Sequence, residues 1–307
     1  MLTIFRKKFR SAASNLLHLA WDRRFREYYR QRRVTDIDER EAIADQFAAT
    51  LPSSKAGALA SYAEAITKLQ NEGIVTLDNL ISNTQLTDIR KHFTKVLAYD
   101  PYRPELGKYW APDEVPAQTH VSHYSHDQIL AAPHLMDIAN DPRVLLVVEG
   151  ALGAKPTLAA IRVWWSTPTQ SGEPEHAELF HRDVDDLRFI KLFVYLTDVD
   201  ENTGPHMFVS GSHRQNRLTA ISRYGDSEVE QAFGSRNILS ITGKAGTAFL
   251  ENTFGVHRGV PPRQGPRLIF QPLYTLRPVI FGPPKPLCRR ENFSPSFDPY
   301  INRVFLR

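Results

Sequence analysis

The chain has almost no cysteine and no long apolar run, and these two absences exclude several kinds of site and of protein. Cys288 is the single cysteine among 307 residues, so an internal disulfide is impossible and zinc sites built from several thiolates are excluded. So little cysteine suits the cytoplasm or another reducing compartment. No stretch of about 18 uncharged apolar residues occurs, which argues against a membrane-spanning helix. Internal repeats and low-complexity tracts are also missing.

Composition and charge point to a globular domain with a basic N-terminal segment. Hydrophobic residues make up 42% and charged residues 23%, a mixture that excludes wholesale disorder and fibrous structure. Residues 1–33 carry ten Lys or Arg against two acids, whereas the rest carries 28 bases and 32 acids. Because the positive excess belongs to this segment alone, we expect no nucleic-acid partner for the domain.

The first 20 residues have the pattern of an amphipathic helix, with Phe5, Phe9, Leu16 and Ala20 among the apolar residues at three-to-four spacing. Three interpretations remain open. Residues 1–33 could make peripheral contact with an anionic membrane. They could instead be an organelle-targeting segment, since the first acid is Asp22. The third interpretation is a helix that is solvated or packed on the domain.

The remaining pattern divides the chain into three parts and predicts an α+β fold. We expect a basic helical extension and linker over 1–55, a main domain of helices and strands over 56–277 and an extended C-terminal arm over 278–307. Helices are predicted at 58–71, 84–99, 126–140 and 144–152, and a strand at 73–77. Further strands are predicted at 157–166, 179–183, 189–197, 206–209, 245–250 and 267–276. Helices followed by many short strands with Gly and Pro turns predict a sandwich, jelly roll or barrel buttressed by helices.

A metal site is predicted where two ligand-type residues lie two positions apart. His181 and Asp183 share one face if they end a strand. His257, after a strand-like segment, is the best third ligand. Two imidazoles and one carboxylate on one side of a metal leave other positions open, as in non-haem iron(II) oxygenases. Asp185 is a weaker candidate for the carboxylate.

Two basic residues suggest a cosubstrate beside this metal. Arg267 follows a proline-rich turn after His257, so a returning strand would bring it back to the level of that histidine. Because arginine binds carboxylates through two parallel hydrogen bonds, Arg267 suits the far carboxylate of 2-oxoglutarate, whose keto-acid end would chelate the metal. Lys191 either helps to hold 2-oxoglutarate or pairs with an acid, as a lysine in a barrel interior must.

Several spaced segments resemble one family. They are residues 181–183, 189–200, 202–205 and 209–213, together with His257 and Arg267. Over residues 70–277 the sequence resembles the phytanoyl-CoA dioxygenase-like family of Fe(II)- and 2-oxoglutarate-dependent oxygenases. The resemblance implies a double-stranded β-helix (a jelly roll, cupin-like) in which His181, Asp183 and His257 bind the catalytic iron and Arg267 binds 2-oxoglutarate.

The same resemblance implies the reaction. 2-Oxoglutarate and O2 would be consumed to give succinate and CO2, with hydroxylation of a substrate C–H bond; desaturation or ring chemistry remains open. Halogenating relatives carry a small residue where this chain has Asp183, so the acid favours hydroxylation. Ascorbate is expected to support activity in vitro.

The substrate and oligomeric state are not readable from the sequence. A small-molecule or lipid-linked substrate is expected, with Arg162, Trp164 and His206 as candidate contacts. Arg162 either meets an anionic substrate or forms a surface ion pair. Two other functions remain open: a non-catalytic jelly-roll protein that binds a metal or ligand, and a cupin-type metalloenzyme without 2-oxoglutarate, which leaves Arg267 without a role. The evenly spaced His120, His123 and His126 are expected to serve loop hydrogen bonds or substrate contact rather than a second metal, and His213 to fix a turn.

Overall fold

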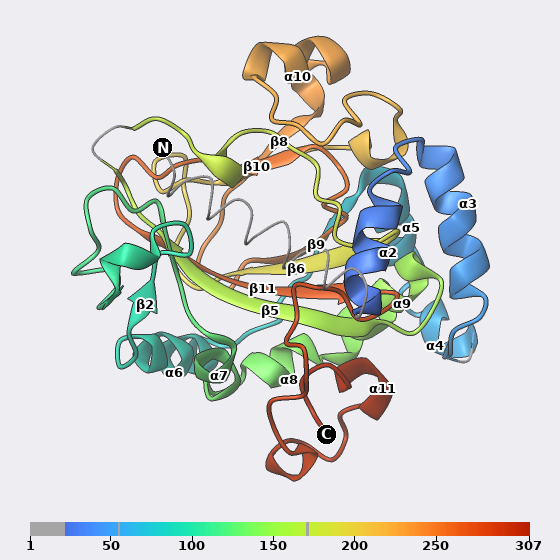
Figure 1. The fold of residues 1–307 in the computed structure, drawn as a ribbon, viewed down its shortest axis with the longest axis horizontal. Helices are drawn as coiled ribbons and strands as arrows, with labels where there is room; N and C mark the ends of the chain where they lie inside the picture. The colour runs from blue at the N-terminus through green and yellow to red at the C-terminus, as the bar shows by residue number, and fades with distance from the viewer. Residues whose placement is uncertain (1–21, 55, 170–171) are drawn as a thin grey trace, which may run out of the picture.

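The computed structural model describes residues 22–54, 56–169 and 172–307, which form two antiparallel sheets facing each other (Figure 1). The large sheet has the order β1-β9-β6-β11-β5-β4-β2-β3, and the small sheet has the order β10-β7-β8. The large-sheet strands are β1 (Ile74–Thr76), β2 (Ala98–Tyr99), β3 (Lys108–Tyr109), β4 (Val121–His123), β5 (Thr157–Ser166), β6 (Phe189–Tyr195), β9 (Ala248–Glu251) and β11 (Arg267–Thr275). The small-sheet strands are β7 (His206–Val209), β8 (Ile238–Ile241) and β10 (His257–Gly259).

Helices flank the sheets and cover the outer face of the large one (Figure 1). They are α2 (Arg23–Gln31), α3 (Ile37–Ala48), α4 (Ala56–Ala60), α5 (Ala63–Glu72), α6 (Asn83–Phe93), α7 (His126–Leu130), α8 (Leu135–Ala139), α9 (Pro142–Leu152), α10 (Asp226–Phe233) and α11 (Pro299–Asn302). Short 3-10 turns lie at Pro104–Leu106, His176–Glu178, Ser212–Arg214, Ser235–Asn237 and Arg290–Asn292.

The central strands are buried on both faces, so each face has its own core. On the outer face, side chains such as Val163 and Phe270 pack with helix residues such as Val148. Between the sheets, Phe193 stacks on Phe249 with ring centroids 5.0 Å apart. Because both faces are covered, these strands are nearly continuous apolar runs rather than strict alternations.

The predicted helices exist, but several of their boundaries were wrong for identifiable reasons. The helix expected over 84–99 begins after Ser82, whose hydroxyl accepts from the N–H of Gln85 while the Gln85 side chain returns to the Ser82 N–H. The helix expected over 126–140 is broken into α7 and α8, because Pro133 cannot donate a helical hydrogen bond. The helix expected over 58–71 is divided into α4 and α5.

The strands show two further differences. The segment 179–183 is not a regular strand and makes only isolated bridges, from Phe180 to Tyr224 and from His181 to His257. Five short strands were not predicted: β2, β3, β4, β8 and β10.

The two ends of the described chain pack on the domain. The segment 278–307, predicted as an extended arm, is only partly extended, since it ends in α11 and buries Ile301 and Phe305. The amphipathic helix predicted for the first 20 residues lies outside the described residues. No helix of the described ranges is both long and apolar enough to cross a membrane. Membrane contact through residues 1–33 stays a prediction.

A buried arginine joins α2 and α3 to the domain. Arg40 is 1% exposed and donates to the side-chain and main-chain oxygens of Gln31, at 2.7 and 3.1 Å, and to the carbonyl of Asp186. The amide of Gln31 donates to the carbonyl of Val184. The N-terminal helices therefore hold the segment that directly follows Asp183.

Replacing Arg40 by methionine is expected to lower the free energy of unfolding by about 1–3 kcal/mol, because buried carbonyls lose their donor. Urea unfolding measures the change. Arg30→Met on the exposed side of α2 is the control and should stay within about 0.5 kcal/mol of the parent chain. Equal losses in the two variants would contradict the role assigned to Arg40.

Candidate metal centre and active site

Three side chains converge between the two sheets. The ligand atoms of His181, Asp183 and His257 all lie within 4.8 Å of one another. Nε2 of His181 is 3.5 Å from Oδ1 of Asp183, and Nε2 of His257 is 3.3 Å from Oδ2. Across the described residues, no other group of three such side chains meets this condition. The structure thus brings together the three residues predicted as ligands.

The backbone explains this convergence although the predicted strand is absent. His181 and His257 form an antiparallel bridge in which each N–H donates to the other's carbonyl at 3.0 Å. Directly opposed residues hold their side chains close on one face, and the two ring centroids are 4.4 Å apart. The N–H of Asp183 donates to the carbonyl of Thr253 at 2.9 Å, which extends the pairing to the third ligand.

Both imidazoles are oriented to present Nε2. Nδ1 of His181 lies 2.8 Å from the carbonyl of Leu179, and Nδ1 of His257 lies 2.9 Å from the carbonyl of Gly255. A carbonyl only accepts, so each Nδ1 carries the proton and each Nε2 keeps a lone pair for a metal. Burial, reinforced by neighbouring His181, lowers the pKa of His257 and keeps it neutral. The donor set fits ferrous iron with open coordination positions.

Lys191 holds the carboxylate ligand. Its Nζ lies 2.5 Å from Oδ2 of Asp183 and 2.8 Å from Oδ2 of Asp185. Burial alone would raise the pKa of Asp183, but the positive charge of Lys191 outweighs it and keeps that pKa well below its usual range. Burial would likewise lower the pKa of Lys191, but the two carboxylates raise it instead. The acidic partner expected for a buried lysine is therefore present, while its contact with 2-oxoglutarate stays a prediction.

Arg267 is a buried cation with spare donors. It is 4% exposed, and its Nη2 donates to Oγ of Ser166 at 3.1 Å. Its Nε and Nη1 are buried and have no hydrogen-bond partner among the described residues. A buried guanidinium with unpartnered donors suits an anionic group such as a carboxylate. A side chain at Gly259 would come within 3.3 Å of Nη2, so the glycine leaves that group room.

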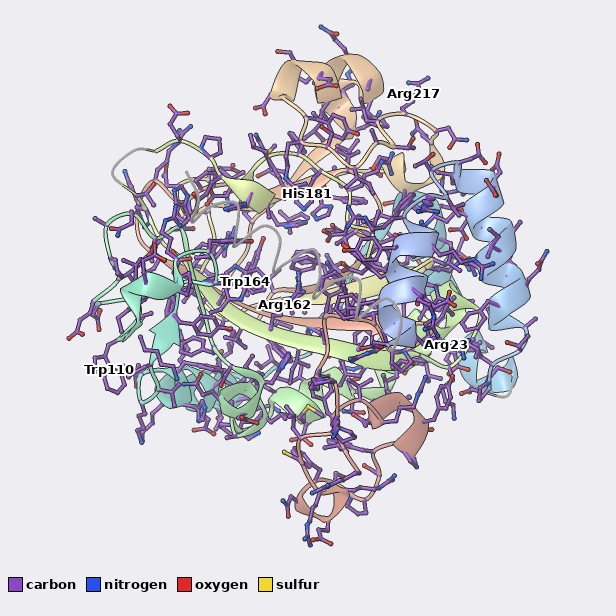
Figure 2. The ribbon with its side chains drawn as sticks, viewed as in Figure 1. Arg23, Trp110, Arg162, Trp164, His181 and Arg217 are labelled. Carbon is purple, nitrogen blue, oxygen red and sulfur yellow. The ribbon has the colours of Figure 1, made fainter. Side chains whose placement is uncertain are left out.

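Arg267 and the triad line one cavity of about 180 Å³. Along β5, alternate residues Arg162, Trp164 and Ser166 face it, and they pair in register with Gln271, Ile269 and Arg267 of β11, which also line it. Figure 2 shows Arg162 and Trp164 near β5, with His181 closer to the small sheet. Trp165 points the other way and donates to the hydroxyl of Tyr124 at 3.1 Å in the outer core.

His206 also lines the cavity, and it has a partner that sequence reasoning missed. Its Nε2 lies 3.1 Å from Oε1 of Glu251. Burial raises the pKa of Glu251 to about 8 and lowers that of His206 to about 3, so both groups are uncharged at neutral pH. The His206 ring stacks 5.5 Å from that of His257. The only signal for Glu251 was a lone acid at the end of an apolar strand.

The other histidines do not converge. Each has a structural contact of its own: Glu178 for His120, Trp164 for His123, Phe305 for His126 and the carbonyl of Gln70 for His213. The hydrogen-bonding roles expected for His120 and His213 are confirmed, whereas His123 in β4 and His126 in α7 make ring contacts instead of loop hydrogen bonds.

Fold and site together define a double-stranded β-helix with a His-Asp-His group that could hold a metal ion. The family described as Phytanoyl-CoA dioxygenase (PhyH) matches residues 69–261. The chain belongs to this family of Fe(II)- and 2-oxoglutarate-dependent oxygenases, as the sequence motifs predicted. Curated proteins yield no significant match.

Solved structures with the same fold confirm the predicted architecture. EctD from S. alaskensis, solved with 2-oxoglutarate and 5-hydroxyectoine, is 18% identical with a TM-score of 0.52, covering 80% of this chain and 87% of its own. HygX from Streptomyces hygroscopicus, solved with nickel, 2-oxoglutarate and hygromycin B, is 15% identical with a TM-score of 0.51 over 78% and 96%. The carbocyclase SnoK from nogalamycin biosynthesis is 17% identical with a TM-score of 0.51 over 71% and 87%.

Proposed function

We propose that the protein is an Fe(II)- and 2-oxoglutarate-dependent dioxygenase that hydroxylates an unactivated C–H bond of a small-molecule or lipid-linked substrate. The observation that carries the proposal is a complete set in one cavity: three converging ligands, and a buried arginine whose Nε and Nη1 lack partners among the described residues. Family membership and neighbours solved with 2-oxoglutarate support it.

Each residue has a definite task. Iron with 2-oxoglutarate and O2 supplies the oxidising chemistry, with release of succinate and CO2. His181 and His257 hold the ion through Nε2, and Asp183 holds it through a carboxylate oxygen whose orientation Lys191 maintains. Arg267 and Ser166 bind the remote carboxylate of the cosubstrate, which orients it within the cavity.

The alternatives explain less of the site. A cupin-type metalloenzyme without 2-oxoglutarate leaves the two free donors of Arg267 unexplained, and burying them without a partner costs free energy. A non-catalytic relative gives no reason for the three converging ligands and the buried arginine to be present together. Hydroxylation is proposed because Asp183 occupies the position that halogenation requires to be small. We place the protein in the cytoplasm or another reducing compartment because its single thiol has no cysteine to pair with.

The test is succinate production from 2-oxoglutarate by the full chain with iron(II) and ascorbate across a metabolite panel. We expect a low rate without substrate and a higher rate with the right one, and no turnover with His181→Ala. Failure of the iron-loaded chain to form succinate under all conditions would favour the non-catalytic alternative.

A further inference from the structure

The cavity holds a second guanidinium that nothing in the proposed iron and cosubstrate site uses. Arg162 projects from β5, is half-buried and lies over the ring of Phe281 at 5.4 Å. Within the described ranges, no carboxylate lies at ion-pair distance from it and no acceptor takes its hydrogen bonds. The surface ion pair considered from the sequence is therefore not formed among these residues.

The other charged side chains lining the cavity already have partners among the described residues. Lys191 pairs with two aspartates, Glu175 with Arg103 at 2.7 Å, and Glu178 with His120 at 2.7 Å. Burial, with the nearby Arg162, lowers the pKa of His123 to about 3, so this neighbour is neutral. Arg162 and Arg267 are thus the two cavity cations left without a counter-charge by the described residues. A partly desolvated cation is stabilised when a ligand brings the missing charge.

These two cations extend into the cavity from main-chain positions at different levels of the sheet. Arg162 lies four residues along β5 from Ser166, the hydrogen-bond partner of Arg267, and a strand rises about 3.3 Å per residue, or ~13 Å in all. A 2-oxoglutarate held at its remote carboxylate by Arg267 directs its keto-acid end toward the triad, which leaves Arg162 available for another ligand. Trp164 and Ile269 form the wall between them, and His123 stacks on Trp164 at 5.8 Å, so the intervening surface is aromatic and apolar.

From this placement we propose that the substrate is a small molecule with an apolar or aromatic body and one oxyanion, a carboxylate or a phosphate, which Arg162 binds. The inference rests on the proposed function and specifies its substrate class. Arg162 is preorganised for this task, because the ring of Phe281 lies under its guanidinium and is itself packed edge-on by Tyr28 of α2 at 5.6 Å. Its role is to position the substrate body along Trp164.

The test compares charged and neutral probes of one shape. The full chain is saturated with Zn(II) and 2-oxoglutarate, which fill the triad and Arg267, and calorimetry measures binding of phenylacetate against phenylacetamide and of phenyl phosphate against phenol. We expect the parent chain to favour at least one anion over its neutral partner by about tenfold or more. The preferred pair tells carboxylate from phosphate.

Variants of Arg162 test whether this residue causes the preference for the anionic probe. Arg162→Gln should bring the ratio close to one and Arg162→Lys should keep part of it, whereas Arg236→Gln, on the exposed surface, should leave it unchanged. No preference in the parent chain, no binding of either anion, or a preference that survives Arg162→Gln overturns the proposal.

Binding of 2-oxoglutarate is measured separately in each variant. Normal binding with no anion preference refutes the oxyanion subsite and leaves the proposed function standing. An Arg162-dependent preference in a chain that fails to bind 2-oxoglutarate supports the subsite and refutes the proposed function.

Discussion

Replacing Arg267 by methionine is expected to weaken 2-oxoglutarate binding by at least about 100-fold while metal binding persists. The guanidinium offers two free donors in a buried site, and hydrogen bonds to charged groups contribute about 1.5–3 kcal/mol each. Calorimetry under anaerobic conditions, and the KM for 2-oxoglutarate, measure the loss. The same variant should form almost no succinate at ordinary cosubstrate concentrations.

Two related variants sharpen this result. Arg267→Lys keeps the charge but loses the fork of parallel donors, so an intermediate affinity is expected. Ser166→Ala removes one neutral partner of Nη2 and should cost no more than about tenfold. An unchanged KM for 2-oxoglutarate in Arg267→Met would instead favour a cupin-type metalloenzyme that needs no keto acid.

Replacing Asp183 by alanine should remove both tight metal binding and activity. The site has three protein ligands, and the loss of one leaves two neutral imidazoles to hold a divalent ion. We expect the metal affinity to fall by more than about 100-fold, beyond the 10–100-fold typical when only a supporting residue changes. Metal content after dialysis, and titration with Co(II), measure this directly.

Asp185→Asn is the matched control for that change. Asp185 contacts Lys191 but is not among the converging ligands, and Asp183 still neutralises the lysine in this variant. The variant should retain one metal per chain. Metal bound by Asp183→Ala with the affinity of the parent chain would contradict the assignment of the ligands.

The three candidate ligands and Arg267 could be predicted from the sequence because the chemistry of these residue types at this spacing is specific. A His-x-Asp pair, a later histidine and a following arginine match one type of metal centre, whatever the exact secondary structure. The strand predicted around His181 was wrong, yet the three predicted side chains converge, because the single bridge to His257 does the positioning that a whole strand was expected to do.

The other features of the site could not be predicted, because they depend on contacts between residues far apart in the sequence. Glu251 has no motif, and its role comes from facing His206 across the barrel. The hydrogen bonds of Arg40 to Gln31 and to the carbonyl of Asp186 join residues 9 and 146 positions apart. The sequence pattern gives no sign of these contacts. Likewise, that no acid of the described ranges pairs with Arg162 is a property of the assembled cavity.

The position of β11 between β5 and β6 has a consequence for biosynthesis. Ser166 and Arg267 are 101 residues apart, and non-local strand pairings of this kind form late because the intervening loop must first be closed. A polypeptide still emerging from the ribosome before residue 257 offers only two of the three ligands and no guanidinium from β11. The candidate metal centre and the guanidinium that faces it are therefore completed only after residues 257 and 267 have been synthesised and β11 has paired with β5.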